Sequence, residues 1–173
     1  LTATLSAIKY INKNRSIIQI GFPYVDVLKL PQIIFQGSHL VVNTKLSHVK
    51  EELNKKNPAA LIIEIPSNPL LKCVDLISIA KLAQDKNIPI IVDDTIGSSI
   101  NVHLTPYADV IFSSLTKTFA GRGDIMAGST VISPYSKWKK ELKEIIPKVS
   151  LSTLSNADSI QLSLTSRNVQ DRL

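Results

Sequence analysis

Cysteine and long apolar runs are scarce in this sequence, and both shortages exclude whole classes of protein. Cys73 is the only cysteine among 173 residues, so disulfides do not build the fold, and we expect a cytoplasmic protein. Cys73 itself falls in a helical pattern, where we expect it to pack. No apolar run approaches the roughly 18 residues that span a membrane, and the sequence contains no secretory signal. We therefore expect neither a membrane-spanning segment nor secretion.

Clustered charge of one sign is also missing. Lysine and arginine number 20 against 14 aspartates and glutamates, which gives a formal net charge of +6. The lysines are scattered except in residues 135–146, YSKWKKELKEII, which carry their own glutamates and are typical of a solvated helix face. We therefore expect no nucleic-acid partner. The three histidines, His39, His48 and His103, share no metal-ligand spacing, so no metal site is expected.

Strand and helix patterns alternate along the chain. Apolar residues make up 44% of the sequence, which is enough for one domain, or a large piece of one, with a real core. Short β-branched or continuous apolar runs predict strands in 16–22, 39–44, 59–66, 88–94, 108–114 and 126–133. This alternation predicts an α/β fold: a mostly parallel sheet with helices on both faces.

Apolar residues at helical spacing predict three helices. Residues 45–56 place Leu46, Val49 and Leu53 on one stripe. Residues 73–87 do the same with Leu76, Ile79, Ala80 and Ala83, and a third helix carries Trp138, Leu142 and Ile145.

Polar side chains follow three successive strand patterns. Because ligands gather at the carboxyl ends of parallel strands, these residues predict a binding site at one edge of the sheet. They are Glu64, Ser67 and Asn68 in the first group, Asp93, Asp94 and Thr95 in the second, and Ser113, Ser114, Thr116 and Lys117 in the third.

The third group suits a phosphorylated aldehyde. A lysine at a partly buried rim can lose its proton and form a Schiff base, while hydroxyls and the amides of a tight turn suit a phosphate. A carboxylate on a neighbouring strand end can pair with a protonated ring nitrogen. Pyridoxal phosphate carries all three groups. Each residue also has a plainer interpretation: a solvated lysine, aspartates that cap a turn, an Asn–Pro turn signal and a packed tyrosine.

The ordered set of motifs resembles one family. The stretches GFPYVDVLKL, EIPSNPLLKCVDLISIAKLA, PIIVDDT, PYADVIFSSLTKTFAGRGDIMAGS and ADSIQLSLTSRNVQDR are similar to those of the cystathionine gamma-synthase family, the pyridoxal-phosphate enzymes of trans-sulfuration. They look closest to its fungal cystathionine gamma-synthase-like members. The resemblance implies the large cofactor domain of the aspartate-aminotransferase-like enzymes, called fold type I, with pyridoxal 5'-phosphate as cofactor.

The resemblance also implies roles for particular residues. Lys117 would be the Schiff-base lysine and would later move protons at the α and β carbons of the substrate. Asp93 would bind the pyridinium nitrogen, and Tyr24 would stack on the ring.

Three further residues would complete the cofactor site. Asn68 would lie near the ring hydroxyl, and Ser114 and Thr116 would supply phosphate-binding hydroxyls. Asp94 stands where many relatives carry asparagine, and Arg122 where many carry histidine. Neither is given a catalytic role.

The implied reaction is gamma-replacement of an O-acylhomoserine by cysteine, which yields cystathionine. The implied substrates are small amino acids, and relatives form active sites between subunits, so a homodimer or homotetramer is implied for a complete enzyme. Three alternatives stay open: a cystathionine lyase, a homocysteine-forming sulfhydrylase, and a non-catalytic remnant that pairs with a complete relative.

The sequence also departs from the family pattern. Residues 1–173 correspond to an incomplete large domain, and the N-terminal arm and C-terminal small domain of relatives are absent, so we expect little turnover from the chain alone. Thr4 and Leu5 occupy the place of a glycine-methionine pair that binds phosphate at a helix start. The Thr4 hydroxyl would face the anion there, and its side chain would obstruct close approach.

Overall fold

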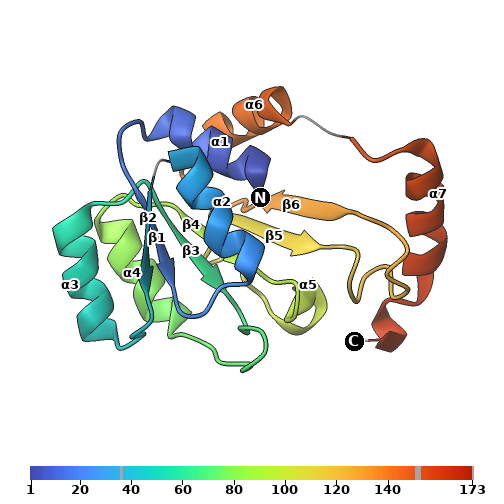
Figure 1. Ribbon diagram of the computed structural model, residues 1–173, viewed down its shortest axis with the longest axis horizontal. Helices are drawn as coiled ribbons and strands as arrows, with labels where there is room; N and C mark the ends of the chain where they lie inside the picture. Colours follow the sequence, from blue (N-terminus) through green and yellow to red (C-terminus); the bar gives the residue numbers. More distant parts are fainter. Residues whose placement is uncertain (36, 151–152, 173) are drawn as a thin grey trace.

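Across the residues that the computed structural model describes, 1–35, 37–150 and 153–172, six strands form one sheet in the order β2-β1-β3-β4-β5-β6 (Figure 1). Strands β1 to β5 pair in parallel, and β6 runs antiparallel to β5. The predicted α/β fold with a mostly parallel sheet is therefore confirmed. The strands are β1 (Ile17–Ile20), β2 (Ser38–Val41), β3 (Ala60–Glu64), β4 (Ile90–Asp93), β5 (Val110–Ser114) and β6 (Gly128–Ile132).

Helices cover both faces of the sheet (Figure 1). One face carries α1 (Thr2–Ile11), α2 (Val25–Phe35) and α6 (Lys139–Val149), and the other carries α3 (Leu46–Lys56) and α4 (Leu76–Asp85). The short α5 (Ser98–Asn101) follows β4. Near the C-terminus, α7 (Asn156–Thr165), η1 (Ser166–Asn168) and η2 (Gln170–Arg172) lie beyond the end of β5 (Figure 1). No helix in these ranges is long and apolar enough to cross a membrane.

Two apolar cores result from the alternation of side chains along the central strands. In β3, Ile62 packs with the α1 side of the sheet, while Leu61 and Ile63 pack with the α3 and α4 side. Successive side chains of a strand point to opposite faces, so a strand buried on both faces must be apolar throughout. This explains the continuous runs from which the sequence predicted these strands.

Two expectations about single residues are wrong. Leu46 keeps 38% of its surface exposed, although Val49 and Leu53 of the same stripe are buried. It is the first residue of α3, where no preceding turn lies beneath its side chain. Cys73 is exposed, because the Asp75 side chain accepts the Ser78 N–H and starts α4 only at Leu76, which leaves Cys73 in the preceding loop.

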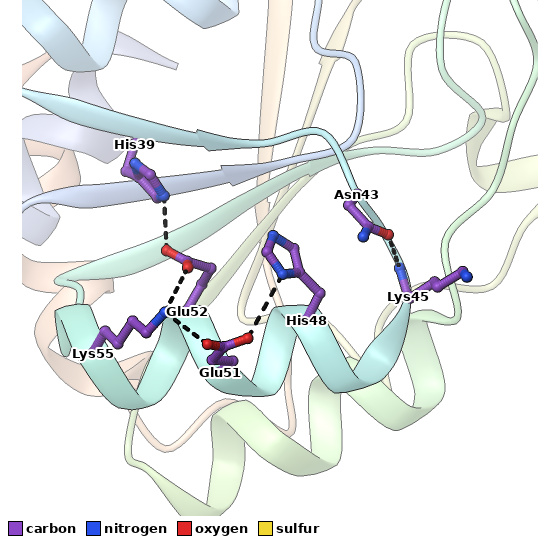
Figure 2. A network of polar contacts seen from close by, with 7 residues as sticks. All are labelled: His39, Asn43, Lys45, His48, Glu51, Glu52 and Lys55. Carbon is purple, nitrogen blue, oxygen red and sulfur yellow. Dashed lines mark hydrogen bonds and ion pairs between the residues drawn. The ribbon is translucent and has the colours of Figure 1, made fainter.

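A polar network ties α3 to the edge strand β2 (Figure 2). His39 Nε2 lies 2.8 Å from Glu52 Oε2, and Lys55 Nζ lies 3.6 Å from Glu52 Oε1 and 2.7 Å from Glu51 Oε1. His48 Nδ1 lies 3.9 Å from the other Glu51 oxygen. Glu52 is only 9% exposed, so this network gives a buried carboxylate its partners.

The central strand offers a test of the packing. Ile91 of β4 is fully buried, so Ile91→Ala should lower the free energy of unfolding by about 3 kcal/mol, through lost apolar contact and the cavity left behind. Urea denaturation measures this loss. Ile77→Ala is the control: Ile77 on α4 is 62% exposed, and its removal should change stability by less than about 0.5 kcal/mol. Equal losses would contradict the observed packing.

Candidate active site

A cavity of about 800 Å³ opens where β3, β4 and β5 end. The parallel register sets Glu64 beside Asp93 and Asp93 beside Phe112, so the three strands end at one edge of the sheet, with β5 running on to Ser114. The predicted gathering of polar strand ends is therefore observed. The residues that line the cavity include Tyr24, Glu64, Asn68, Asp93, Thr95, Ser113, Ser114 and Lys117.

Asp93 is the buried acid of this cavity. It is 6% exposed, and its Oδ1 accepts hydrogen bonds from the Thr95 N–H at 3.0 Å and the Thr95 hydroxyl at 2.6 Å. Burial raises the pKa of Asp93, and the two bonds from Thr95 only partly oppose that rise. A cation placed beside this carboxyl would favour its charged form.

Asp94 differs from its neighbour in where its side chain lies. It is also buried, at 4% exposed, yet it does not line the cavity, and its Oδ1 has no hydrogen-bond partner among the described residues. Burial raises the pKa of Asp94, and the hydrogen bond with Ser113 lowers it. Of the two acids, only Asp93 can meet a ligand in the cavity.

Glu64 connects two loops that contribute to the cavity. Its Oε2 accepts the backbone N–H of Tyr24 at 2.6 Å, and its Oε1 accepts that of Asn68 at 2.9 Å. Tyr24 precedes α2 and is 46% exposed, and Asn68 follows β3. Both residues line the cavity, so one carboxyl group holds the backbone of two predicted ring contacts.

Lys117 lies in the turn that follows β5. Its N–H donates to the Ser114 carbonyl at 3.3 Å, and its carbonyl accepts from the Gly121 N–H at 2.8 Å. The side chain lines the cavity but is exposed, so the expected partial burial is wrong. Its Nζ has no hydrogen-bond or ion-pair partner within the described part of the chain, which leaves the amine available to a ligand.

Arg172 of η2 braces the same turn. Its Nε donates to the Thr118 carbonyl at 3.1 Å, and its Nη2 donates to the Phe119 carbonyl at 2.5 Å. Gly121 has φ of +76°, and a Cβ there would lie 2.6 Å from Arg172 Nε. Glycine therefore both permits this turn and leaves room for the arginine.

The two hydroxyls predicted for a phosphate are placed differently. Ser114 lines the cavity, and its N–H donates to the Thr95 hydroxyl at 2.9 Å. Thr116 does not line the cavity, because its hydroxyl accepts the Ala127 N–H at 3.1 Å. The phosphate contact of Thr116 stays a prediction.

The first turn of α1 lies at the cavity with residues other than those expected. Thr2 and Ala3 line the cavity, whereas Thr4 and Leu5 are fully buried in the protein. The expectation that the Thr4 side chain stands in the path of an anion is therefore wrong. The amides of this turn have no earlier helical turn to bond, so they remain available as donors.

Sequence reasoning placed Glu64 and Thr95 at the strand ends without giving either a role. The Thr95 hydroxyl joins Asp93 to the Ser114 backbone, and Glu64 joins Tyr24 to Asn68. The sequence does show an acid and a hydroxyl among apolar residues at the ends of buried strands, which indicates that both need hydrogen-bond partners. It does not indicate which residues those partners are.

Solved structures define the fold class of the chain. A cystathionine gamma synthase from Xanthomonas oryzae pv. oryzae matches with a TM-score of 0.81 at 19% identity, and the match covers 98% of this chain and 45% of that one. A cystathionine gamma-lyase from Lactobacillus plantarum matches with a TM-score of 0.77 at 23% identity, covering 98% and 45%. The chain therefore has the fold of the pyridoxal-phosphate enzymes of fold type I.

Sequence comparison then gives the family. The chain belongs to the Cys/Met metabolism PLP-dependent enzymes, whose family model matches residues 28–166. A cystathionine gamma-synthase of Neurospora crassa is 32% identical over 161 residues, which cover 90% of this chain and 26% of that protein. The chain thus spans about a quarter of this relative. Pyridoxal 5'-phosphate is the expected cofactor of the family, as the sequence predicted.

The raised pKa of Asp93 can be tested by measuring how the free energy of unfolding depends on pH. A carboxyl whose pKa is raised by folding destabilises the folded protein above that pKa, by about 1.4 kcal/mol for each unit of the rise. Asp93→Asn should therefore stabilise the cofactor-free protein at neutral pH. The gain should shrink as pH falls and vanish below the ordinary aspartate pKa, because both proteins are then neutral at this position.

Urea denaturation at several pH values measures this gain. Asp75→Asn is the control, since the hydrogen bonds with Ser78 lower the pKa of this exposed cap, and its replacement should give no stabilisation at neutral pH. An Asp93→Asn protein that is no more stable at neutral pH than at acid pH would contradict the assigned burial.

Proposed function

We propose that the cavity binds pyridoxal 5'-phosphate and that Lys117 is its Schiff-base partner. The observation that carries this proposal is the meeting of an unpartnered amine, a buried acid and an aromatic ring at one cavity: Lys117 after β5, Asp93 at the end of β4 and Tyr24 before α2. Strands that are neighbours in the sheet supply the amine and the acid.

The chemistry of these groups fits the cofactor. The cavity of about 800 Å³ lies within the range of roughly 300–1,000 Å³ that small-molecule sites occupy. Asp93 is a carboxyl whose pKa is raised by burial, and a protonated ring nitrogen is the partner that would restore its charge. The Ser114 hydroxyl and the amides of the first turn of α1 suit a phosphate.

Each residue would contribute a separate task. Asp93 keeps the ring nitrogen protonated, and Thr95 holds the Asp93 carboxyl in place through its hydroxyl. Tyr24 would stack on the ring, and Asn68 would hydrogen-bond the ring hydroxyl. When bound, the cofactor supplies an electron sink for the substrate carbon from which a proton is removed.

Lys117 has two tasks in this proposal. Its Nζ would hold the cofactor through the aldehyde group. The same amine, when free, would remove a proton from the substrate α carbon and move protons at the β carbon. The Ser114 hydroxyl and, by prediction, the Thr116 hydroxyl hold the phosphate, which fixes the ring while the amine moves.

For the whole protein we propose gamma-replacement of an O-acylhomoserine by cysteine. The γ C–O bond breaks with loss of the acyl group as a carboxylate, the thiol S–H bond gives up its proton, and a C–S bond forms at the γ carbon. The curated relative from Neurospora crassa carries the name of this activity, which favours it over cystathionine cleavage or homocysteine formation. The fold alone does not choose between them, because a lyase shares it. A cytoplasmic homodimer or homotetramer remains part of the proposal.

The Schiff base can be tested directly. Mixing the protein with pyridoxal phosphate should give a yellow adduct, which borohydride reduces and peptide mapping locates at Lys117. Lys117→Ala should abolish the mapped adduct, since Lys117 is the only lysine side chain that lines the cavity among the described residues. Lys81→Ala, which removes an exposed lysine of α4 outside the cavity, should leave it unchanged. An equal reducible adduct in the Lys117→Ala protein would refute this assignment.

The reaction can be tested with two substrate mixtures. With the whole protein, an acylhomoserine with cysteine should give cystathionine, while cystathionine alone should give no free thiol above background. Chromatography of the amino acids and a thiol assay measure the two products. Thiol release from cystathionine as the faster reaction would favour the lyase. Cofactor binding without either reaction would favour the non-catalytic remnant.

A further inference from the structure

Glu64 lies at the end of β3 and lines the cavity. Within the described part of the chain, its side-chain hydrogen bonds go to the backbone N–H groups of Tyr24 and Asn68, not to Lys117 or Asp93. We infer that Glu64 is a positioning residue, which sets Tyr24 and Asn68 at the distances that the cofactor ring requires. This inference rests on the proposed function and extends it to a residue that does not itself act on the substrate.

The geometry of the two hydrogen bonds carries the inference. One oxygen accepts the Tyr24 N–H at 2.6 Å, and the other accepts the Asn68 N–H at 2.9 Å. Tyr24 lies 40 residues away in the chain, so the contact joins the loop after β1 to the loop after β3. One side chain therefore ties the two loops together by hydrogen bonds.

Other contacts hold each loop internally without joining the two. The Tyr24 carbonyl accepts the Leu28 N–H at 2.8 Å, which fixes Tyr24 to the start of α2. Ser67 exchanges backbone hydrogen bonds with Leu71 and Lys72 inside its own turn. Glu64 is thus the hydrogen-bonded link between the two loops in the described ranges, and its loss would free them to move apart.

The surroundings of Glu64 explain why a carboxylate is needed there. The side chain is 6% exposed and sits beside Asp93 in the sheet register, which is an unfavourable place for a second acid. Burial first, and then Asp93, raise the pKa of Glu64, whereas the two N–H donors lower it. A carboxylate can accept both N–H groups, but a glutamine has only one oxygen and would turn a donor toward one of them.

Glu64→Gln is the experiment. The variant should fold and still form the adduct at Lys117, but its affinity for pyridoxal phosphate should fall about tenfold, because one part-buried N–H is left without an acceptor. The circular dichroism that the protein induces in the bound cofactor should also change, since this signal reports the orientation of the ring. Spectroscopic titration and the dichroism band measure the two effects.

Glu52→Gln is the matched control. Glu52 is also a buried glutamate with polar partners, but it belongs to the network on α3 and does not line the cavity (Figure 2). Its replacement should lower stability while leaving the affinity and the dichroism of the bound cofactor unchanged. The comparison separates a general effect of losing a buried acid from an effect on the site.

A double-mutant cycle tests whether Glu64 acts through Tyr24. In a Tyr24→Ala background, Glu64→Gln should cost clearly less affinity than it does in the wild type, because the ring that Glu64 positions is already missing. Additive losses would overturn the inference. Wild-type affinity and dichroism in the single Glu64→Gln variant would overturn it as well.

The wild-type protein offers a check that needs no variant. Hydrogen exchange measured by NMR should find the amide hydrogens of Tyr24 and Asn68 protected, as expected for N–H groups bonded to a buried carboxylate. Rapid exchange at both positions would overturn the inference even if Glu64→Gln failed to fold. A wild-type protein that forms no Lys117 adduct would instead refute the proposed function, while adduct formation with an unaffected Glu64→Gln variant would refute this inference alone.

Discussion

The parallel pairing of β3, β4 and β5 is the constraint on which the site depends. Because the strands run in the same direction and in register, Glu64, Asp93 and the end of β5 stand at one edge of the sheet. An antiparallel strand in the place of β4 would carry its polar end to the opposite edge. The buried apolar strands that fix this register therefore also position the acids and the lysine.

That arrangement has a cost in stability, which explains the contacts around the acids. Glu64, Asp93 and Asp94 are all nearly buried, and burial raises the pKa of each. Backbone N–H groups and the Thr95 hydroxyl compensate in part, but the Asp94 Oδ1 remains without a hydrogen-bond partner among the described residues. Buried acids with raised pKa values beside a cavity are typical of functional sites, where a cationic ligand offsets the free-energy cost of burying a charged carboxylate.

The sequence was sufficient to predict which residues of the site lie together, where that depends only on the direction of parallel strands. Lys117 and Asp93 each follow a buried apolar run, and parallel strands bring such positions together. Contacts made across long stretches of sequence could not be read in this way. The Thr116 hydroxyl bonds Ala127, which lies 11 residues further on, and Glu64 bonds Tyr24, which lies 40 residues earlier. The choice of partner depends on loop paths that no periodicity encodes.

The three helices predicted from apolar spacing are present as α3, α4 and α6, but α2 was not predicted, for a related reason. The sequence of α2, VDVLKLPQIIF, contains Pro31 in its interior and apolar residues on several sides, so it shows no clear stripe. Only Val27 and Pro31 of its residues are buried. The helix forms because its packing on β1 and β2 favours it, and its start carries Tyr24 to the cavity. Tertiary contact here outweighs local preference, as it commonly does.

The difference between Asp93 and Asp94 follows from the same strand geometry. Successive side chains along an extended chain point in opposite directions, so two adjacent acids cannot both face one cavity. Asp93 is the last residue of β4 and faces the cavity, where Thr95 bonds it, while Asp94 turns toward Ser113 on the neighbouring strand. A shift of β4 by one residue would exchange the two acids and turn its apolar residues to the wrong faces. The packing of Ile91 and Val92 therefore decides which carboxyl group a ligand meets.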